Sequence, residues 1–325
     1  MTAMMQPQTR GESATEAVVV PRRGGRRNGF RAQARPRRKG LLTFGHWWWA
    51  LPGIVLVLGI HYAATIAGGF FAFTDWTGIG AFEFIGIDNF TRIFADPSKM
   101  LALGNTLFLA FGSVILTNVI GLGLAVALNR LLKTRYILRT LFFMPVVLSP
   151  LAVAYVWKFI FDYNGPLNAV LTAVGLGDLA RAWVGDPTFA IWTILIVIVW
   201  QQTGFSMVIY AAGLAGVPVE IEEAATIDGT TLWQRFRHVT LPAIRPAVAI
   251  ATTLGLVNGL RIFDQIMALT GGGPAGATET LATEVYKQAF SLGQFGYGAA
   301  LALVLTAIIL VFAIIQQRVT QEKED

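Results

Sequence analysis

The sequence predicts an all-α fold, a polytopic membrane helical bundle with six transmembrane helices. Of its 325 residues, 54% are hydrophobic and 14% are charged, and the mean hydropathy is +0.59. A soluble domain usually carries roughly 25% charged residues, and a soluble chain of this size cannot remove so much apolar surface from water. The composition therefore excludes an ordinary soluble enzyme, a disordered chain and a disulfide-stapled secreted domain.

Six apolar stretches are long enough to cross a bilayer core, for which a helix needs roughly 20 residues. Only the third and the fifth contain charged residues. These are Arg139 and Lys158 in the third, and Arg245, Arg261 and Asp264 in the fifth. These charges lie near the ends of their stretches, where long side chains can reach the interface. The predicted spans are residues 47–73, 104–128, 137–161, 189–213, 244–269 and 297–315.

The positions of the basic residues orient this bundle. With six spans, 19 of the 25 Lys and Arg residues lie on one side, whereas the acidic residues divide 9 against 10. By the positive-inside rule, both termini are expected in the cytoplasm. The predicted organisation is a basic cytoplasmic tail at 1–46, a six-span transmembrane domain at 47–320 and a short cytoplasmic tail at 321–325.

The basic tail needs its own interpretation. Residues 1–46 carry a net charge of +8 and are rich in Gly, Arg and Pro. Such a composition lacks an apolar face and is typical of disorder. An RNA-binding arm is one interpretation, but we favour attraction to anionic lipid of the bilayer and expect no nucleic-acid partner.

No catalytic or metal site is predicted. The chain has no Cys, and its three His residues have no metal-ligand spacing, which excludes thiol nucleophiles and thiolate sites. It also has no phosphate loop of the Gly-x-x-x-x-Gly-Lys-Ser/Thr type. We therefore expect no cofactor to be bound by this chain.

The loop between the fourth and fifth spans, residues 217–245, is predicted to form two short helices. Pro218 suits the first turn of a helix, and the carboxylates that follow favour the positive end of its dipole. Asp228-Gly229 then forms a turn, and Thr230 or Thr231 can cap a second helix.

This loop resembles a known signature. Glu223-Ala224-Ala225, three residues, Gly229, nine residues and then Val239-Thr240-Leu241-Pro242 is similar to the "EAA" motif of binding-protein-dependent ABC importer permeases. The motif usually has Ile where this chain has Val239. The resemblance implies a type I ABC importer permease fold. It also implies that this coupling loop (residues 217–245) contacts a separate ATPase through Glu223, Ala224, Ala225, Asp228, Gly229, Leu241 and Pro242.

Further residues resemble the carbohydrate-uptake branch, near the maltose and glycerol-phosphate permeases. They include Phe263-Asp264, Leu269-Thr270-Gly271-Gly272-Gly273-Pro274 and Phe295-Gly296-Tyr297-Gly298. The resemblance implies an ATP-driven sugar importer in a bacterial cell membrane. Its partners would be a second permease in a heterodimer, a cytoplasmic ATPase dimer that binds ATP and Mg²⁺, and an extracytoplasmic solute-binding protein.

The solute pathway is expected among polar side chains inside the spans, because such groups are costly in lipid. The candidates are Gln201, Gln202, Tyr210, Asn258, Arg261 and Asp264. Gln201 and Gln202 point about 100° apart on a helix, so at most one faces a lumen squarely. Helix–helix hydrogen bonds are an equal alternative for the amides, and mutual neutralisation is favoured for Arg261 and Asp264.

Four alternatives to a sugar importer remain open at this point. An importer of glycerol-phosphate or another polyol ester would need a cationic pocket. An ion-coupled secondary carrier usually has carboxylates at the span centres, and here there are none. A channel or a membrane-embedded enzyme finds no supporting motif.

Overall fold

The computed structural model describes residues 47–129 and 133–321, and the chain divides into two compact units, Met1–Gly53 and Ile54–Asp325. The tail predicted to be disordered at 1–46 lies outside the described residues, as do residues 322–325. In the first unit, the described residues form a 3₁₀ turn at Trp47–Ala50 and the start of α1 (Leu51–Leu56).

The second unit is helical throughout its described part, where the single β feature is a bridge between Thr74 and Phe84. Three segments, η2, η4 and η5, are π-helical turns, and η3 is a 3₁₀ turn. In chain order the elements are η2 (Val57–Tyr62), α2 (Ala63–Phe71), α3 (Asp88–Ala95), α4 (Pro97–Leu128), α5 (Arg135–Val147), α6 (Pro150–Ile160), α7 (Pro166–Ala173), η3 (Gly177–Leu179), α8 (Pro187–Ala215), α9 (Val219–Ile227), α10 (Leu232–Arg235), η4 (Phe236–Thr240), α11 (Leu241–Ala243), α12 (Arg245–Leu260), α13 (Asp264–Leu269), α14 (Leu281–Tyr286), η5 (Lys287–Ser291) and α15 (Phe295–Gln321).

Four helices of the described chain are long and apolar enough to cross a membrane, and two bent pairs bring the number to six if each counts as one span. The four are Leu51–Phe71, Pro97–Leu128, Pro187–Ala215 and Phe295–Arg318, which correspond to the first, second, fourth and sixth predicted spans. The prediction of a polytopic all-α membrane bundle is confirmed.

The other two predicted spans are not continuous helices. Residues 137–161 divide into α5 and α6, which are bent by 98°. The bend follows from Pro150, which disfavours a helical conformation at Ser149 before it. Residues 244–269 divide into α12 and α13, and α12 is itself bent by 70° from the segment Leu232–Ala243 that precedes it.

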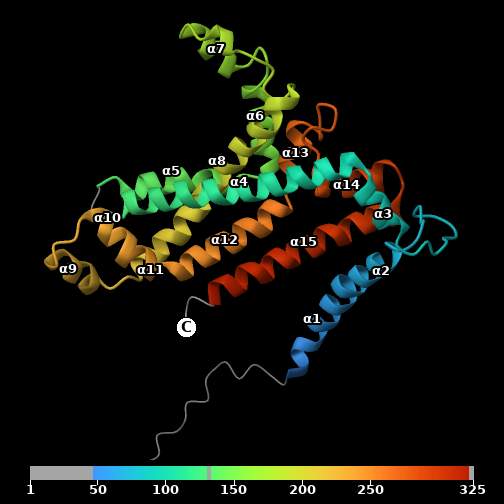
Figure 1. Cartoon of the computed structure of the whole chain (residues 1–325), viewed down its shortest axis with the longest axis horizontal. Coiled ribbons are helices and arrows are strands. Elements are labelled where there is room, and N and C mark those ends of the chain that lie inside the picture. The colour runs from blue at the N-terminus through green and yellow to red at the C-terminus, as the bar shows by residue number, and fades with distance from the viewer. Residues whose placement is uncertain (1–46, 130–132, 322–325) are drawn as a thin grey trace, which may run out of the picture. The chain divides into compact units, whose positions relative to one another are not determined.

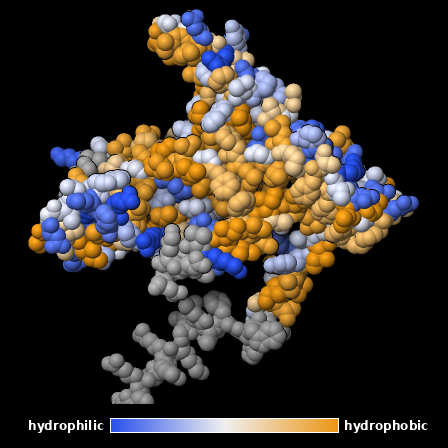
Figure 2. Space-filling model, viewed as in Figure 1, coloured by the Kyte–Doolittle hydropathy of each residue, from blue (hydrophilic) through white to orange (hydrophobic). Residues whose placement is uncertain are grey.

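Helices α4, α8, α12 and α15 run alongside one another and form the body of the bundle (Figure 1). Small residues let the helices approach closely, as is common in membrane bundles. A Cβ on Gly204 of α8 would lie 2.2 Å from the Phe142 carbonyl oxygen of α5, and one on Gly259 of α12 would lie 2.8 Å from the Ala110 Cα of α4. Hydrophobic residues cover the middle of the face in Figure 2, and hydrophilic ones gather towards its two ends.

The two ends of the second unit differ in what they carry. One end holds α9, α10 and α11, and we call it the coupling end; the opposite end holds α3 and α14 (Figure 1). At the opposite end, the first turn of α4 and α14 enclose an ion pair between Lys99 and Glu284, whose Nζ and Oε2 atoms are 2.8 Å apart. Lys99 is 6% exposed and Glu284 is 0% exposed. Asn105 Nδ2 fastens the same region by donating to the carbonyl oxygens of Ala277 and Glu279, each at 2.9 Å.

A second lysine and a second carboxylate complete this ion cluster. Lys287 pairs with Glu279, and its Nζ lies 3.8 Å from Glu284 Oε1. Burial opposes the charge of Glu284, but the neighbouring Glu279 carboxyl, Lys99 and Gln288 together lower its pKa to about 2. Burial, followed by the proximity of Glu284, raises the pKa of Glu279. When the carboxyl groups of Glu279 and Glu284 hold one proton between them, that proton therefore resides on Glu279.

Candidate functional site

The coupling loop folds as two short helices joined by a sharp turn, as predicted. Pro218 is the N-cap of α9, which ends at Ile227, and Gly229 then has φ +73°, the left-handed region that glycine adopts without strain. Of the two candidate caps, Thr231 begins α10 and forms a reciprocal capping box with Gln234. Thr230 Oγ1 instead donates to the Ala225 carbonyl oxygen at 2.6 Å.

The residues implied by the signature divide between an outer and an inner face of this loop. Glu223, Ala224, Asp228 and Gly229 are exposed, whereas Ala225 is 7% exposed. Large apolar side chains of the same loop are also exposed. Ile227 is 86% exposed, and Val219, Leu232 and Trp233 are 65–67% exposed. An exposed apolar patch of this kind is typical of a surface that contacts a protein partner or the membrane.

The coupling loop packs against the bundle. Leu241 and Val217 pack against a core cluster of α4, α8 and α12 that includes Leu214 and Ile244. Arg235 in α10 donates to Thr226 Oγ1 of α9 at 2.9 Å, which ties the two short helices together. Half-buried Pro242 lies in α11, directly before the bend at Ile244.

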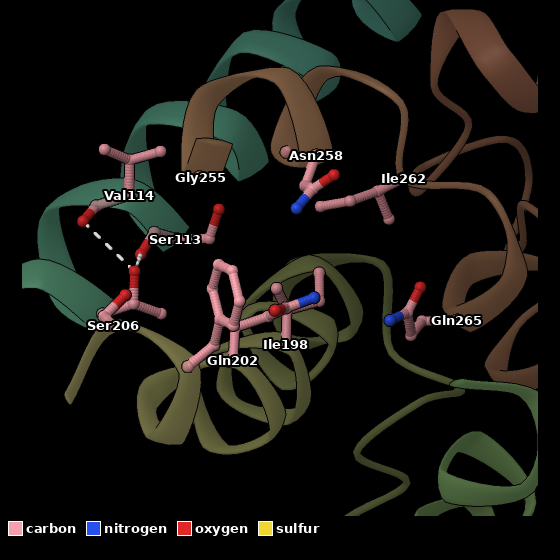
Figure 3. A pocket seen from close by; sticks show the side chains of 12 residues that line it. Ser113, Val114, Ile198, Gln202, Ser206, Gly255, Asn258, Ile262 and Gln265 are labelled. Carbon is pink, nitrogen blue, oxygen red and sulfur yellow. Dashed lines mark hydrogen bonds between the residues drawn. The ribbon is translucent and has the colours of Figure 1, made fainter. Parts of the chain in front are cut away.

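A polar crevice lies in the middle of the bundle between α4, α8 and α12 (Figure 3). It has a volume of about 30 Å³, above the roughly 10–15 Å³ that one water molecule needs and far below the few hundred Å³ of a typical ligand pocket. No lining side chain is ionisable. The twelve lining residues are Ser113, Val114, Thr117, Ile198, Gln202, Phe205, Ser206, Gly255, Asn258, Gly259, Ile262 and Gln265.

Two of the six pathway candidates line this crevice. Gln202 from α8 and Asn258 from α12 both border it (Figure 3). Gln201 is 3% exposed and lies outside the lining, in accord with the expected divergence of the adjacent glutamines. Its Nε2 donates to the Leu148 carbonyl oxygen at 3.0 Å, and its Oε1 accepts from Gln265 Nε2 at 3.2 Å.

The other three candidates are not brought to the crevice. Tyr210 is 1% exposed and donates through its hydroxyl to Asn118 Oδ1 of α4, an interhelical hydrogen bond. Arg261 follows the last residue of α12 and Asp264 begins α13, so the expectation that they share one helical face is wrong. Both are exposed, and no ion pair joins them among the described residues.

Several crevice residues were missing from the sequence-based set. Ser113 and Thr117 are four residues apart on α4, as are Gln202 and Ser206 on α8, so each pair shares a helical face. This spacing was a usable signal. Gln265 also had a signal, because it is an amide inside the predicted span 244–269, but its orientation depends on the break between α12 and α13.

Comparisons with known proteins agree with this architecture. Residues 118–324 match the family described as "Binding-protein-dependent transport system inner membrane component". The chain is 36% identical over 288 residues to the Multiple sugar-binding transport system permease protein MsmF of Streptococcus mutans, with 88% of this chain and 99% of that protein covered. It is 35% identical to the Diacetylchitobiose uptake system permease protein NgcF of Streptomyces coelicolor, with 86% and 84% covered.

A third relative and one solved structure extend the comparison. The Trehalose/maltose transport system permease protein MalF of Thermococcus litoralis is 32% identical, with 77% of this chain and 84% of that protein covered. A chain from a bacterial ABC transporter involved in the import of alginate has the same fold, with a TM-score of 0.74, 22% identity and coverage of 84% and 94%. This chain therefore belongs to the family of binding-protein-dependent transport system inner membrane components and is a multi-pass membrane transport subunit rather than an enzyme.

Proposed function

We propose that this chain is one of two permease subunits of an ATP-driven importer for a neutral sugar, with an oligosaccharide as the expected solute. The crevice carries this proposal. Its amides and hydroxyls can pair with sugar hydroxyl groups, Phe205 offers a ring surface, and no ionisable side chain lines it. The names of the three relatives point to the same solute class.

The competing solute, a glycerol-phosphate or another polyol ester, fits this crevice less well. A phosphate group requires cationic or clustered N–H donors. Arg261 and Lys158, the cations considered for that role, do not line the crevice, and Lys158 instead donates to the Ala268 carbonyl oxygen at 3.4 Å. The neutral lining therefore favours a sugar.

We further propose that the coupling loop binds the cytoplasmic ATPase. The exposed signature residues, led by Glu223, and the uncovered apolar side chains of Ile227 and Trp233 support this contact. ATP and Mg²⁺ would be bound by the ATPase alone. This assignment places both termini in the cytoplasm and the opposite end of the bundle towards an extracytoplasmic solute-binding protein.

The small crevice volume is consistent with alternating access. About 30 Å³ cannot hold a sugar, so the spans must separate for solute to enter. Movement of α9 and α10 by the ATPase would reach α4, α8 and α12 through the core cluster at Leu214 and Ile244. Access would then alternate as the bundle moves against the second permease.

The test is uptake by the complete transporter, with its second permease, ATPase and binding protein in sealed vesicles. Labelled maltose, trehalose and diacetylchitobiose serve as probes, with glycerol-phosphate as the competing class. We expect at least one sugar to accumulate, and this accumulation should require ATP on the side of the membrane where the ATPase is bound. Uptake that persists without ATP under an ion gradient, or uptake of glycerol-phosphate alone, would refute the proposal.

Two sets of variants connect the uptake to the residues. Glu223→Arg should abolish uptake while the subunit remains in the membrane, because it reverses the charge at the ATPase contact. Gln202→Leu and Asn258→Leu should lower uptake while ATPase binding is retained. Thr306→Val on the exposed face of α15 is the matched control, since Thr306 donates only to the Ala302 carbonyl oxygen of its own helix at 2.7 Å.

A further inference from the structure

The two broken spans are held by one side chain of α8. α5 ends at Val147, and its C-cap Leu148 has an extended backbone with φ −75° and ψ 143°. Gln201 Nε2 donates to the Leu148 carbonyl oxygen at 3.0 Å. After the break in the fifth span, Gln265 in the first turn of α13 donates to Gln201 Oε1 at 3.2 Å. The Gln201 side chain therefore binds beside both breaks. Its amide N–H donates at the break between α5 and α6, and its amide oxygen accepts from Gln265 after the break between α12 and α13.

Both amides of this relay are removed from solvent. Gln201 is 3% exposed and Gln265 is 6% exposed. A buried amide that loses its partner loses its hydrogen-bond energy without regaining water, so these bonds resist opening. Inside a membrane bundle, an interhelical amide bond of this kind determines the position of the helices it joins.

The segments that follow the two breaks also pack on each other. Val153 and Ala154 of α6 share a core cluster with Ile266 and Leu269 of α13 and with residues of α8. Lys158 of α6 adds its hydrogen bond to the Ala268 carbonyl oxygen. α6 and α13 thus form one packed unit, which Gln201 fastens to α8.

The same relay reaches the solute crevice. Gln265 lines the crevice together with Gln202 and Asn258 (Figure 3). Because Gln265 donates through Nε2 to Gln201, its carbonyl oxygen remains available as an acceptor for a hydroxyl group in the crevice. The orientation of this amide is therefore set by Gln201, which does not itself line the crevice.

We propose that Gln201 is a positioning residue that fixes the packed α6–α13 unit to α8 and orients Gln265 for solute recognition. The second part rests on the proposed function, because it requires that the crevice take up the solute. The first part concerns the bend between α5 and α6 and stands on the hydrogen bonds alone. The two parts predict different measurable effects.

The bend is measured by the distance between two spin labels in the complete transporter in nanodiscs without solute. The chain has no Cys, so Met144→Cys in α5 and Tyr155→Cys in α6 are its only labelling sites, and they are 56% and 60% exposed. The partner subunits are used with any Cys replaced. We expect one narrow distance peak with Gln201 present. Gln201→Met, which keeps the side-chain volume, and Gln201→Asn, which is one methylene shorter, should both lose that single peak.

Gln202→Met is the matched control, because Gln202 is adjacent in α8 and borders the crevice but takes no part in the relay. It should keep the narrow peak while lowering uptake. For Gln201→Met we expect the KM for whichever of the three sugars the wild type accumulates to rise about tenfold, as the loss of one buried hydrogen bond implies, with ATP hydrolysis retained.

The outcomes separate the two proposals. A narrow peak in either Gln201 variant overturns the positioning role. The role is also overturned if both Gln201 variants fail to assemble while Gln202→Met assembles, because the hydrogen bonds of Gln201 would then be required for folding only. If the peak is lost in the Gln201 variants but Gln202→Met and Asn258→Leu transport normally, the positioning of α6 and α13 holds. In that case the proposed role of the crevice fails.

Discussion

Replacing Lys99 by Met should destabilise the protein strongly, because it leaves Glu284 buried without its closest partner. At 2.8 Å and an effective dielectric constant of about 20, the attraction between the two charges is about 6 kcal/mol. Desolvation costs several kcal/mol for each ion, so the intact pair contributes little net stability. Removing one partner keeps the desolvation cost of the other, and the expected loss is about 3–5 kcal/mol.

The matched control removes both charges. In Lys99→Met/Glu284→Met the buried site becomes apolar at similar volume, and stability should return to within about 1–2 kcal/mol of the wild type or exceed it. Lys287 loses one neighbour in this variant but keeps Glu279, and its side chain is 48% exposed.

The assay is thermal unfolding in one detergent, followed by tryptophan fluorescence. Converted at about 2–4 °C for each kcal/mol, the single variant should unfold about 6–20 °C below the wild type. Equal midpoints for Lys99→Met and the wild type would refute the reasoning, as would a double variant no more stable than the single one. The first result would mean that Glu284 accepts a proton or water at no cost, and the second that the packing, not the charge, is responsible.

Three further predictions concern other parts of the chain. The pKa of Glu284 is lowered to about 2, so its ionised form stabilises the fold above its ordinary value of 4.5, and this stability is lost as the pH falls from about 4.5 to 2. Acid titration of thermal stability should therefore be steeper for the wild type than for Lys99→Met/Glu284→Met over this range. Parallel curves would contradict this prediction. Gly204→Ala should prevent assembly of the bundle, since its Cβ would lie 2.2 Å from the Phe142 carbonyl oxygen. Size-exclusion chromatography in detergent measures this, and a normal elution profile of the variant would show that α5 and α8 can separate. Thr231→Ala should weaken α10 by about 1 kcal/mol through loss of the capping box, seen as faster amide exchange over residues 232–235, whereas unchanged exchange would show that the bundle, not the cap, holds this helix.

Local signals account for what the sequence predicted well. The turn at Gly229 and the cap of α10 depend on residues within a few positions of each other. The sequence predicts the turn and leaves Thr230 and Thr231 as the candidate caps, of which the structure uses Thr231. The apolar length of α4, α8 and α15 likewise requires no tertiary information. The bend at Ser149 had a signal in Pro150, but the continuous apolar composition of residues 137–161 concealed it.

Long-range contacts account for what was missed. Lys99 and Glu284 are 185 positions apart, and only the docking of α14 on α4 brings them together. The break between α12 and α13 contains no Pro, and its geometry depends on the bond between Gln201 and Gln265. Arg261 and Asp264 lie on either side of this break. The expectation that they share one helical face assumed a continuous helix and is therefore wrong.

Gly229 shows that a glycine can be required for handedness rather than for size. Its φ is +73°, yet no atom lies within 4 Å of the position that a Cβ would occupy. An L-residue is disfavoured there only by its own backbone, so a D-amino acid introduced by semisynthesis would fit the same turn without strain. A D-residue at this position would therefore test whether the coupling loop requires left-handed backbone geometry rather than a small side chain.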